Sequence, residues 1–292
     1  MVYKNWIISD FDLDVLKALC KFSFLHDYHI AAFTGENRAY VKGRLKQLAV
    51  AGLVKRQQLK AQTPACNWIT TDGLTLVGIK RNSHTPTMAN YEHNRGVADM
   101  CTWLTLPRFG EAHNKRFLTL GDITTERDFN SAREWLVVGT KSDGTNVLKS
   151  DIEVDGIHSP DAFYTRNGKH YALEFERTSK STKDIVESNV KNLMMRFTKQ
   201  YWFWGKLSIR NTLKEIADTL PKGTIGLWDI ELIREELLRY VDSLPKKISK
   251  KSGIPADSAM GEYTTPVSLS KLPIINNTIQ LEKNSTPKVT LE

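Results

Sequence analysis

Cysteine is scarce in this sequence, and it contains no long apolar run. The three cysteines, Cys20, Cys66 and Cys101, lie far apart without a CxxC pair. This argues against a disulfide framework, an iron–sulfur cluster and a cysteine-rich zinc site. No stretch approaches the roughly 18 apolar residues that a membrane-spanning helix needs, and the first ten residues lack the pattern of a secretory signal. We therefore expect a cytoplasmic protein without membrane insertion.

Several common catalytic motifs are also missing. The phosphate-binding patterns GxxxxGK[ST] and GxGxxG do not occur, nor does the serine-hydrolase pattern GxSxG. The usual apparatus for nucleotide hydrolysis and serine-hydrolase chemistry is therefore absent from the sequence.

Positive charge is concentrated at the beginning of the 292-residue chain. The net charge is +8, and the first 90 residues hold 12 Lys and Arg against 6 Asp and Glu. Residues 91–244 hold 22 against 23, and residues 245–292 hold 7 against 4. A basic first third beside a near-neutral middle indicates that the first part binds a polyanion, with a solvated basic face as the alternative.

Residues 11–80 are predicted to form helices followed by a hairpin. Apolar residues recur at helical spacing from Asp12, a short helix covers 29–33, and a turn at 34–37 precedes a basic helix over 38–50. On that helix Val41, Leu45 and Leu48 are expected to face the core. A strand over 53–59 pairs with one over 65–70, and Thr70 begins a further helix.

This order resembles a winged helix-turn-helix domain, to which residues 1–85 are assigned. In that fold the third helix enters the major groove of DNA, while the hairpin contacts the phosphate backbone. A protein–protein module of the same fold is the alternative, and the local charge of +6 disfavours it. The candidate DNA-binding residues are Arg38, Tyr40, Lys42, Arg44, Lys55, Arg56 and Lys60.

A second domain is assigned to residues 86–244, so that the whole chain is of the α+β or α/β class. A helix over 88–106 is followed by strands over 122–127, 157–164 and 170–177, with an Asn167-Gly168 hairpin turn between the last two. A helix over 183–198, a strand over 223–228 and a helix over 230–240 complete it. The aromatic run 201–204 is assigned to the core, with stacking on unpaired bases as the alternative. Residues 245–292 are predicted to be a flexible basic tail.

Three carboxylates are expected to converge on these strands. Glu174 and Glu176 are two residues apart on one strand and so project from the same face. Pairing across the Asn-Gly turn brings Asp161 alongside them. Such a cluster repels itself unless a cation is present, and hard oxygen ligands suit Mg²⁺ or Mn²⁺. The sequence therefore predicts a metal site formed by Asp161, Glu174 and Glu176.

The segment Pro160-Asp161 followed by Glu174-x-Glu176 resembles the PD-(D/E)xK restriction-endonuclease-like nucleases. That resemblance implies that Asp161 and Glu174 hold a divalent metal ion, which activates water for attack on a phosphodiester. Glu176 stands where the family usually has Lys, and it is expected to be a ligand or a water-orienting base. The cationic role then falls to Arg177 or Lys180, with Lys169 as a further option. For the family's upstream acid, Glu126 is the first match and Glu92 the second.

The combination of this site with the preceding domain is similar to replication-relaxation proteins and to the MobC-type relaxases of mobilisable plasmids, over residues 11–205. The resemblance implies nicking of one strand at a plasmid transfer origin, on double-stranded DNA with a melted nic region. It also implies an accessory relaxosome protein and a coupling protein as partners. His26 and His29 do not have the spacing of the metal triad in the common tyrosine relaxases. The alternatives are a non-catalytic plasmid replication or partition regulator and a double-strand restriction-type endonuclease.

Overall fold

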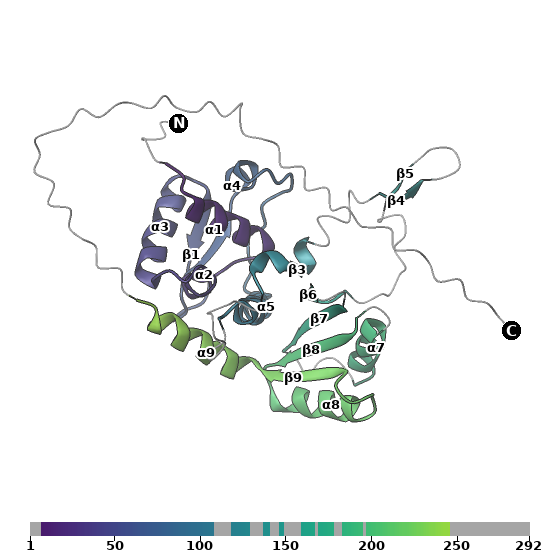
Figure 1. Ribbon diagram of the computed structural model, residues 1–292. Coiled ribbons are helices and arrows are strands. Elements are labelled where there is room, and N and C mark those ends of the chain that lie inside the picture. The colour runs from purple at the N-terminus through teal and green to yellow at the C-terminus, as the bar shows by residue number, and fades with distance from the viewer. Residues whose placement is uncertain are drawn as a thin grey trace, which may run out of the picture. The chain divides into compact units, whose positions relative to one another are not determined.

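The computed structural model describes residues 7–107, 118–128, 137–140, 146–148, 159–166, 169–177, 183–194 and 197–245 (Figure 1). By their contacts, residues Met1–Ile248 form one compact unit. The chain is a mixed α/β protein within these residues. None of the described helices is long and apolar enough to cross a membrane.

Three helices begin the described chain. They are α1 (Asp10–Lys21), α2 (Asp27–Thr34) and α3 (Arg38–Val50). Ser9 and Asp12 form a capping box at the start of α1, and Gly35 ends α2 with φ of 70°, a left-handed conformation that favours glycine. Val41, Leu45 and Leu48 are buried, so the prediction for the inner face of the third helix is confirmed.

A hairpin and a short helix follow. Strands β1 (Val54–Gln57) and β2 (Cys66–Ile69) pair in antiparallel fashion, with Val54 opposite Ile69. Helix α4 (Thr71–Leu76) begins at Thr70, whose hydroxyl accepts from the Gly73 N–H. The predicted strand pair and the predicted helix cap are therefore both present.

The rest of the described chain is built around a five-stranded sheet with the order β3-β6-β7-β8-β9. Its strands are β3 (Ile123–Thr125), β6 (Ala162–Arg166), β7 (Lys169–Glu176), β8 (Lys199–Trp204) and β9 (Ile225–Asp229). The pairs β3–β6 and β6–β7 are antiparallel, whereas the pairs β7–β8 and β8–β9 are parallel. The helices are α5 (Tyr91–Leu104), α7 (Lys183–Met194), α8 (Leu207–Asp218) and α9 (Ile230–Ser243), with a 3₁₀ turn η1 (Leu120–Asp122) before β3. A separate pair, β4 (Val137–Thr140) and β5 (Asn146–Leu148), completes the set.

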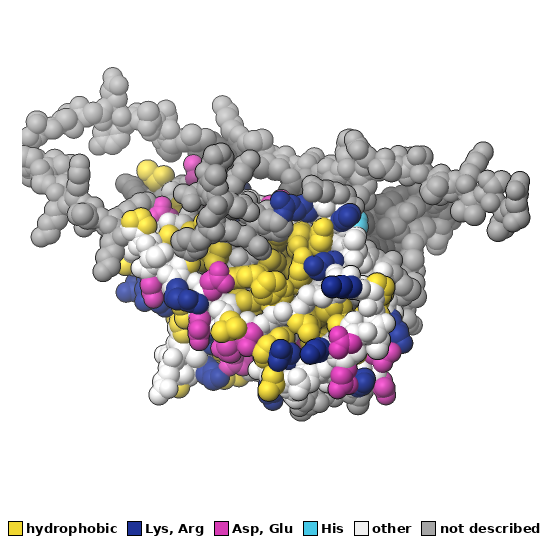
Figure 2. All heavy atoms as spheres, turned by 60° about the horizontal axis from the view of Figure 1, so that its bottom comes forward, with side chains coloured by type: hydrophobic (Ala, Val, Ile, Leu, Met, Phe, Trp, Pro, Cys, Tyr) yellow, Lys and Arg dark blue, Asp and Glu magenta, His cyan; other side chains and the backbone are white. Residues whose placement is uncertain are grey.

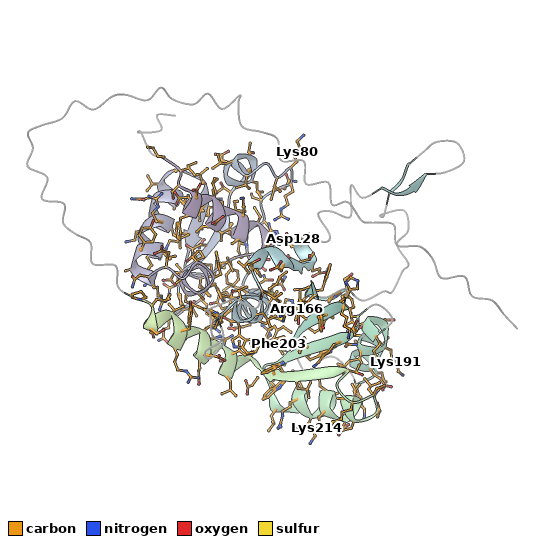
Figure 3. All side chains as sticks on the ribbon, viewed as in Figure 1. Lys80, Asp128, Arg166, Lys191, Phe203 and Lys214 are labelled. Carbon is orange, nitrogen blue, oxygen red and sulfur yellow. The ribbon has the colours of Figure 1, made fainter. Side chains whose placement is uncertain are left out.

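Helices cover both faces of the sheet. Ala172 and Trp202 pack with α7 and α8 in one apolar cluster, while Leu173, Phe175 and Phe203 join a larger cluster with α5, α9 and the N-terminal helices. Phe203 lies at the end of β8 that is nearest α5 and α9 (Figure 3). Because alternate residues of β7 and β8 are buried on opposite faces, the central strands are almost continuously apolar.

Two elements of the sheet region were not predicted, and some assignments were wrong. The run 201–204, expected at the end of a helix, belongs to strand β8, although Trp202 and Phe203 are core residues as proposed. Helix α8 was missed. Glu126 and Arg127, expected on a strand, belong to a helical turn that follows β3. Arg166 pairs with Lys169, as the hairpin prediction requires; the turn residues 167–168 and the predicted tail beyond 245 lie outside the described residues.

Candidate nuclease site

The three neighbouring strands β3, β6 and β7 place an acidic residue each at the same end of the sheet, where these strands begin or finish. The register pairs Thr125 with Ala162 and Ala162 with Leu173. The next residues along, Glu126, Asp161 and Glu174, therefore lie side by side. The Glu126 N–H donates to the Asp161 carbonyl oxygen at 2.9 Å, which continues the ladder by one step.

Asp161 is held in place by both of its carboxylate oxygens. The Phe175 N–H donates to Oδ2 at 2.8 Å, and Nε2 of His93 lies 3.0 Å from Oδ1. Burial alone would lower the pKa of His93, but the hydrogen bond and the charge of Asp161 outweigh it and raise this pKa above its ordinary value. His93 is thus favoured as a cation beside Asp161. From the sequence alone, His93 near the start of the predicted helix over 88–106 could either position substrate or be a capped, hydrogen-bonded histidine.

Glu174 is the most buried acid of the group. Only 5% of the residue is exposed, and burial raises its pKa well above the ordinary value. The nearby charges of Asp161, Glu176 and Glu126 raise it further, while His93 acts in the opposite direction. Glu176, at the end of β7, is half-buried. The four acids therefore lie within electrostatic reach of one another, as the sequence predicted for three of them.

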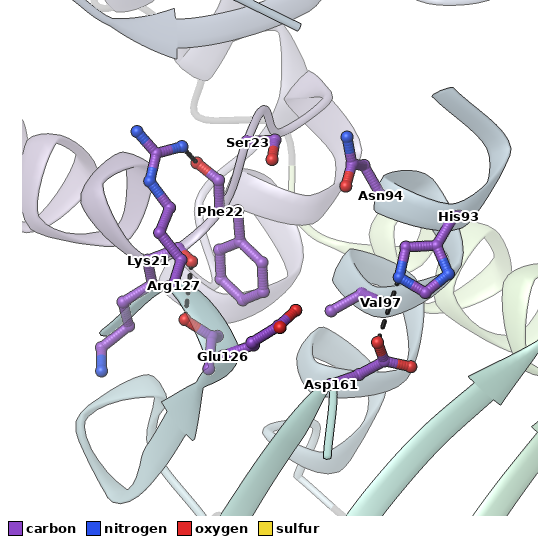
Figure 4. Close-up of a pocket in the computed structure, with 10 residues that line it drawn as sticks. Lys21, Phe22, Ser23, His93, Asn94, Val97, Glu126, Arg127 and Asp161 are labelled. Carbon is purple, nitrogen blue, oxygen red and sulfur yellow. Dashed lines mark hydrogen bonds and ion pairs between the residues drawn. The ribbon is translucent and has the colours of Figure 1, made fainter. Parts of the chain in front are cut away.

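A pocket opens in front of Asp161 and Glu126 (Figure 4). Its other walls come from the end of α1, from the beginning of α5 and from Thr125 and Arg127 beside β3. Figure 4 shows His93 and Asp161 joined on one side, with Glu126 between them and Arg127. The lining residues are Lys21, Phe22, Ser23, His93, Asn94, Val97, Thr125, Glu126, Arg127 and Asp161.

Cationic side chains gather on the α1 side of this pocket. Arg127 donates to the Phe22 carbonyl oxygen at 2.9 Å, and Arg81 donates to the Cys20 carbonyl oxygen. Lys21 contacts Asp128 at 3.0 Å. Burial and the charge of Arg81 lower the pKa of Arg127 to about 10. These cations cap the last carbonyls of α1, and no local sequence pattern pointed to them.

The donor chemistry of the acids suits a divalent cation. Carboxylate oxygens are the ligands that Mg²⁺ and Mn²⁺ prefer, and a cation beside Glu174 would offset the repulsion that raises its pKa. Among the residues that the structure describes, however, no three His, Cys, Asp or Glu side chains are grouped tightly enough to hold a metal ion. His93 already occupies one oxygen of Asp161. A metal ion at Asp161 would therefore share this carboxylate with His93.

The other residues predicted for the site are distributed differently. Of the two upstream acids, Glu126 lies beside Asp161, whereas Glu92 pairs with Lys60 outside the pocket. Arg177 follows β7 directly and is half-buried. Lys169 is at the opposite end of β7 from Glu176. Lys180 lies outside the described residues.

The candidate DNA-binding residues of α3 are partly engaged within the protein. Arg38 and Lys42 both contact the buried Asp27, with Arg38 Nε 3.0 Å and Lys42 Nζ 3.3 Å from Oδ2. Arg44 pairs with Asp12. Arg38 and Arg44 are therefore half-buried, where the sequence predicted outward-facing side chains. They brace α3 against its neighbours because each carboxylate they meet is buried.

The remaining candidates are more accessible. Tyr40 is 38% exposed, with its ring at the edge of Phe11. Lys55 is exposed on the first strand of the hairpin, and Arg56 reaches back to the Lys42 carbonyl oxygen at 3.4 Å.

A buried polar network connects α2 to α5 and α9. Asp99 accepts from the Tyr28 hydroxyl and from His29 Nε2 on one oxygen, both at 2.8 Å, and from Arg234 Nε on the other at 2.8 Å. His29 Nδ1 accepts from the His26 N–H at 3.0 Å. This fixes His29 as the neutral tautomer that donates from Nε2. The sequence gave no sign of this network, because members that bond directly to each other are up to 135 residues apart.

No protein-family model, no curated protein and no solved structure matches the chain.

Proposed function

We propose that the protein is a DNA-binding endonuclease that nicks one strand with the help of Mg²⁺ or Mn²⁺, in the manner of the MobC-type relaxases that its motifs resemble. The observation that supports this most directly is the convergence of Glu126, Asp161 and Glu174 at the ends of three adjacent strands. A mixed sheet with acids at this edge agrees with a PD-(D/E)xK domain.

The N-terminal region is the proposed DNA-recognition part, a winged helix. Its three helices and hairpin come in the order that fold requires. Tyr40, Lys46 and Lys55 are exposed on α3 and on the hairpin, so they are the residues proposed to contact DNA, together with Lys42. Arg38 and Arg44 are assigned to orienting α3. An accessory relaxosome protein and a coupling protein remain proposed partners.

In the proposed reaction Asp161, Glu174 and Glu176 would hold the metal ion, which would supply an activated water and stabilise charge on the phosphate. The protein's own contribution is the positioning of these acids. The Phe175 N–H fixes one oxygen of Asp161, and His93 holds the other. Arg127 and Lys21 line the opposite wall, where a phosphate oxygen would meet positive charge. Arg177 stays a proposed stabiliser of the transition state.

The test is incubation of the protein with its own supercoiled plasmid in Mg²⁺, Mn²⁺ or EDTA, followed on a gel. We expect metal-dependent open circles from the wild type and none from Asp161→Ala, with duplex binding retained. Glu215→Gln is the matched control, because Glu215 is an exposed acid that pairs with Lys183 on the outer helices. Equal nicking by Asp161→Ala would remove the site assignment, and linear product from a dimeric protein would favour a restriction-type enzyme.

One observation favours a second candidate, a non-catalytic DNA-binding regulator. Within the described residues Asp161 is paired with His93, and no tight group of three metal ligands is found. For such a protein the acid variants would bind DNA normally, no metal would promote cleavage, and plasmid maintenance would be unaffected by Asp161→Ala.

A further inference from the structure

One face of the sheet carries a row of aromatic side chains that crosses four strands. Tyr164 on β6 stacks on Tyr171 of β7, with ring centroids 4.8 Å apart and planes inclined by 8°. Tyr171 in turn stacks on Tyr201 of β8 at 6.3 Å and 21°. Trp228 on β9 continues the row and meets Trp103 of α5 at 5.0 Å. We call Tyr164, Tyr171, Tyr201 and Trp228 the aromatic row.

Part of this row is accessible. Tyr171 and Tyr201 are half-buried, and Trp228 is 39% exposed although it is a large apolar residue. Tyr201 lies over Gly226, where an added Cβ would come within 2.9 Å of the ring. The absence of a side chain at Gly226 therefore lets the ring lie flat against β9. Figure 2 shows hydrophobic side chains gathered on the face turned toward the viewer, with Lys and Arg as well as Asp and Glu side chains around them.

Positive charge accompanies the aromatic row on the same face. The register places Arg166 opposite Lys169 and Tyr171 opposite Lys199, so all three cations project on the side of the tyrosines. The ammonium of Lys199 lies 5.0 Å from the centre of the Tyr201 ring. On the positions of β6 to β9 that share this face there is no carboxylate. The acids Glu174 and Glu176 are on the opposite face of β7.

Glu236 of α9, which accepts from Trp103 Nε1, is a carboxylate beside the Trp228 end of the row. Aromatic rings flanked by cations have the chemistry that recognises unpaired nucleic acid. Bases stack on the rings, and phosphates meet the cations, in a way that tolerates any sequence. A duplex cannot use such a surface, because its bases are already stacked on one another. Tyr171 and Glu174 share strand β7, about 10 Å apart along it, and project from opposite faces of the sheet.

We propose that the aromatic row, with Lys169 and Lys199 beside it, binds single-stranded DNA on the face of the sheet opposite Glu174 and Glu176. This inference rests on the proposed action on DNA, but it assigns a binding surface that the nuclease site does not require. Two members of the row are expected to contact bases, and their substitution should weaken binding. Tyr201 already stacks on Tyr171, and Trp228 is exposed.

The test measures binding of a fluorescein-labelled oligothymidine of about 12 nucleotides, a length within the site sizes of single-strand binding folds, by anisotropy in EDTA. We expect Tyr201→Leu to weaken binding roughly 5- to 100-fold, the range that corresponds to one base–aromatic stack. Tyr201→Phe keeps the ring and is expected to bind within about twofold of the wild type. Lys199→Gln is expected to reduce the slope of log K against log salt by about 0.7.

Trp204→Leu is the matched control. Trp204 is on the same strand as Tyr201 and also lies near a cation, with Arg210 5.8 Å from its ring, but it packs on the opposite face with α7 and α8. Its loss is expected to leave oligothymidine binding unchanged. Thermal unfolding of each variant checks the fold, and Trp228→Ala provides a second test at an exposed position, where folding is less at risk.

Three results would overturn the proposal. The first is a wild type that does not bind oligothymidine, and the second is binding by Tyr201→Leu and Trp228→Ala as tight as that of the wild type. The third is a Trp228→Ala variant that turns a dimer into a monomer without affecting oligothymidine binding, which would make the face an interface between two copies. Binding is measured without metal, so the two proposals can fail separately. Binding of single strands without any nicking would refute only the proposed function. Nicking without binding of oligothymidine would refute only the proposed role of the aromatic row.

Discussion

Replacing the buried Asp99 by Asn, which has nearly the same shape, should destabilise the fold strongly. It is completely buried and accepts hydrogen bonds from Tyr28, His29 and Arg234. Burial favours its neutral form, yet the hydrogen bond from His29 and the charges of Arg234 and Arg95 prevail and lower its pKa. In Asp99→Asn the guanidinium of Arg234, 11% exposed as a side chain, loses its buried carboxylate partner.

Removing one partner of a buried ion pair typically costs about 3–5 kcal/mol. For a protein of this size each kcal/mol corresponds to a fall of about 2–4 °C in Tm. We therefore expect Asp99→Asn to lower Tm by about 6–20 °C, measured by circular dichroism at neutral pH. Glu187→Gln removes an exposed pair with Lys191 and is expected to leave Tm nearly unchanged, because exposed ion pairs contribute little to stability.

A double-mutant cycle tests whether Asp99 and Arg234 stabilise the fold through each other. If they do, Asp99→Asn combined with Arg234→Gln should lose less free energy of unfolding than the sum of the losses in the two single variants. A Tm for Asp99→Asn within about 2 °C of the wild type would refute the account, since that corresponds to no more than about 1 kcal/mol. So would strict additivity in the cycle.

Two further predictions concern other buried positions. Burial lowers the pKa of His26 to about 3, so its neutral form stabilises the fold above pH 6.5, and this contribution is lost as the pH falls. At pH 5 we expect urea unfolding to show a loss of about 2 kcal/mol relative to pH 8, and less in His26→Gln; identical pH profiles would contradict this. Gly96 faces Phe175, and a Cβ there would come within 2.2 Å of the ring, so Gly96→Ala should cost about 1–3 kcal/mol. Gly43, also helical but with nothing within 4 Å, should instead gain up to about 1 kcal/mol on substitution by Ala, and the two glycines behaving alike would count against the packing argument.

The elements that could be predicted from the sequence are those specified by local patterns. Thr70 marks the end of the first hairpin and the cap of the next helix. The Asn167-Gly168 pair in the sequence predicts a hairpin, and β6 and β7 pair as that prediction requires. That register is what brings Asp161 beside Glu174, so the central part of the candidate site was predictable. By contrast β8 reads as a nearly uninterrupted apolar run, and periodicity does not separate a buried parallel strand from a helix end.

Tertiary contacts explain the other differences. Arg38 and Arg44 are on the polar face of α3, where they pair with Asp27 and Asp12. The periodicity of a helix predicts which of its side chains point away from its apolar face. It does not predict these pairs, because the two carboxylates belong to α2 and α1. The cations that surround the end of α1 were missed for the same reason, because Arg127 comes from a segment more than a hundred residues away.

Helix α5 connects the proposed DNA-recognition part to the proposed nuclease site. Its first turns carry His93, which holds Asp161, and its middle carries Asp99, which holds α2 and α9 through buried hydrogen bonds. Between them Gly96 allows Phe175 of β7 to approach the helix closely. Since Phe175 is also the residue whose N–H fixes Asp161, a shift of α5 changes two of the contacts that position this acid at once. Substitutions at Asp99 should therefore affect metal-dependent nicking as well as stability, and those in the exposed pairs of α7 should affect neither.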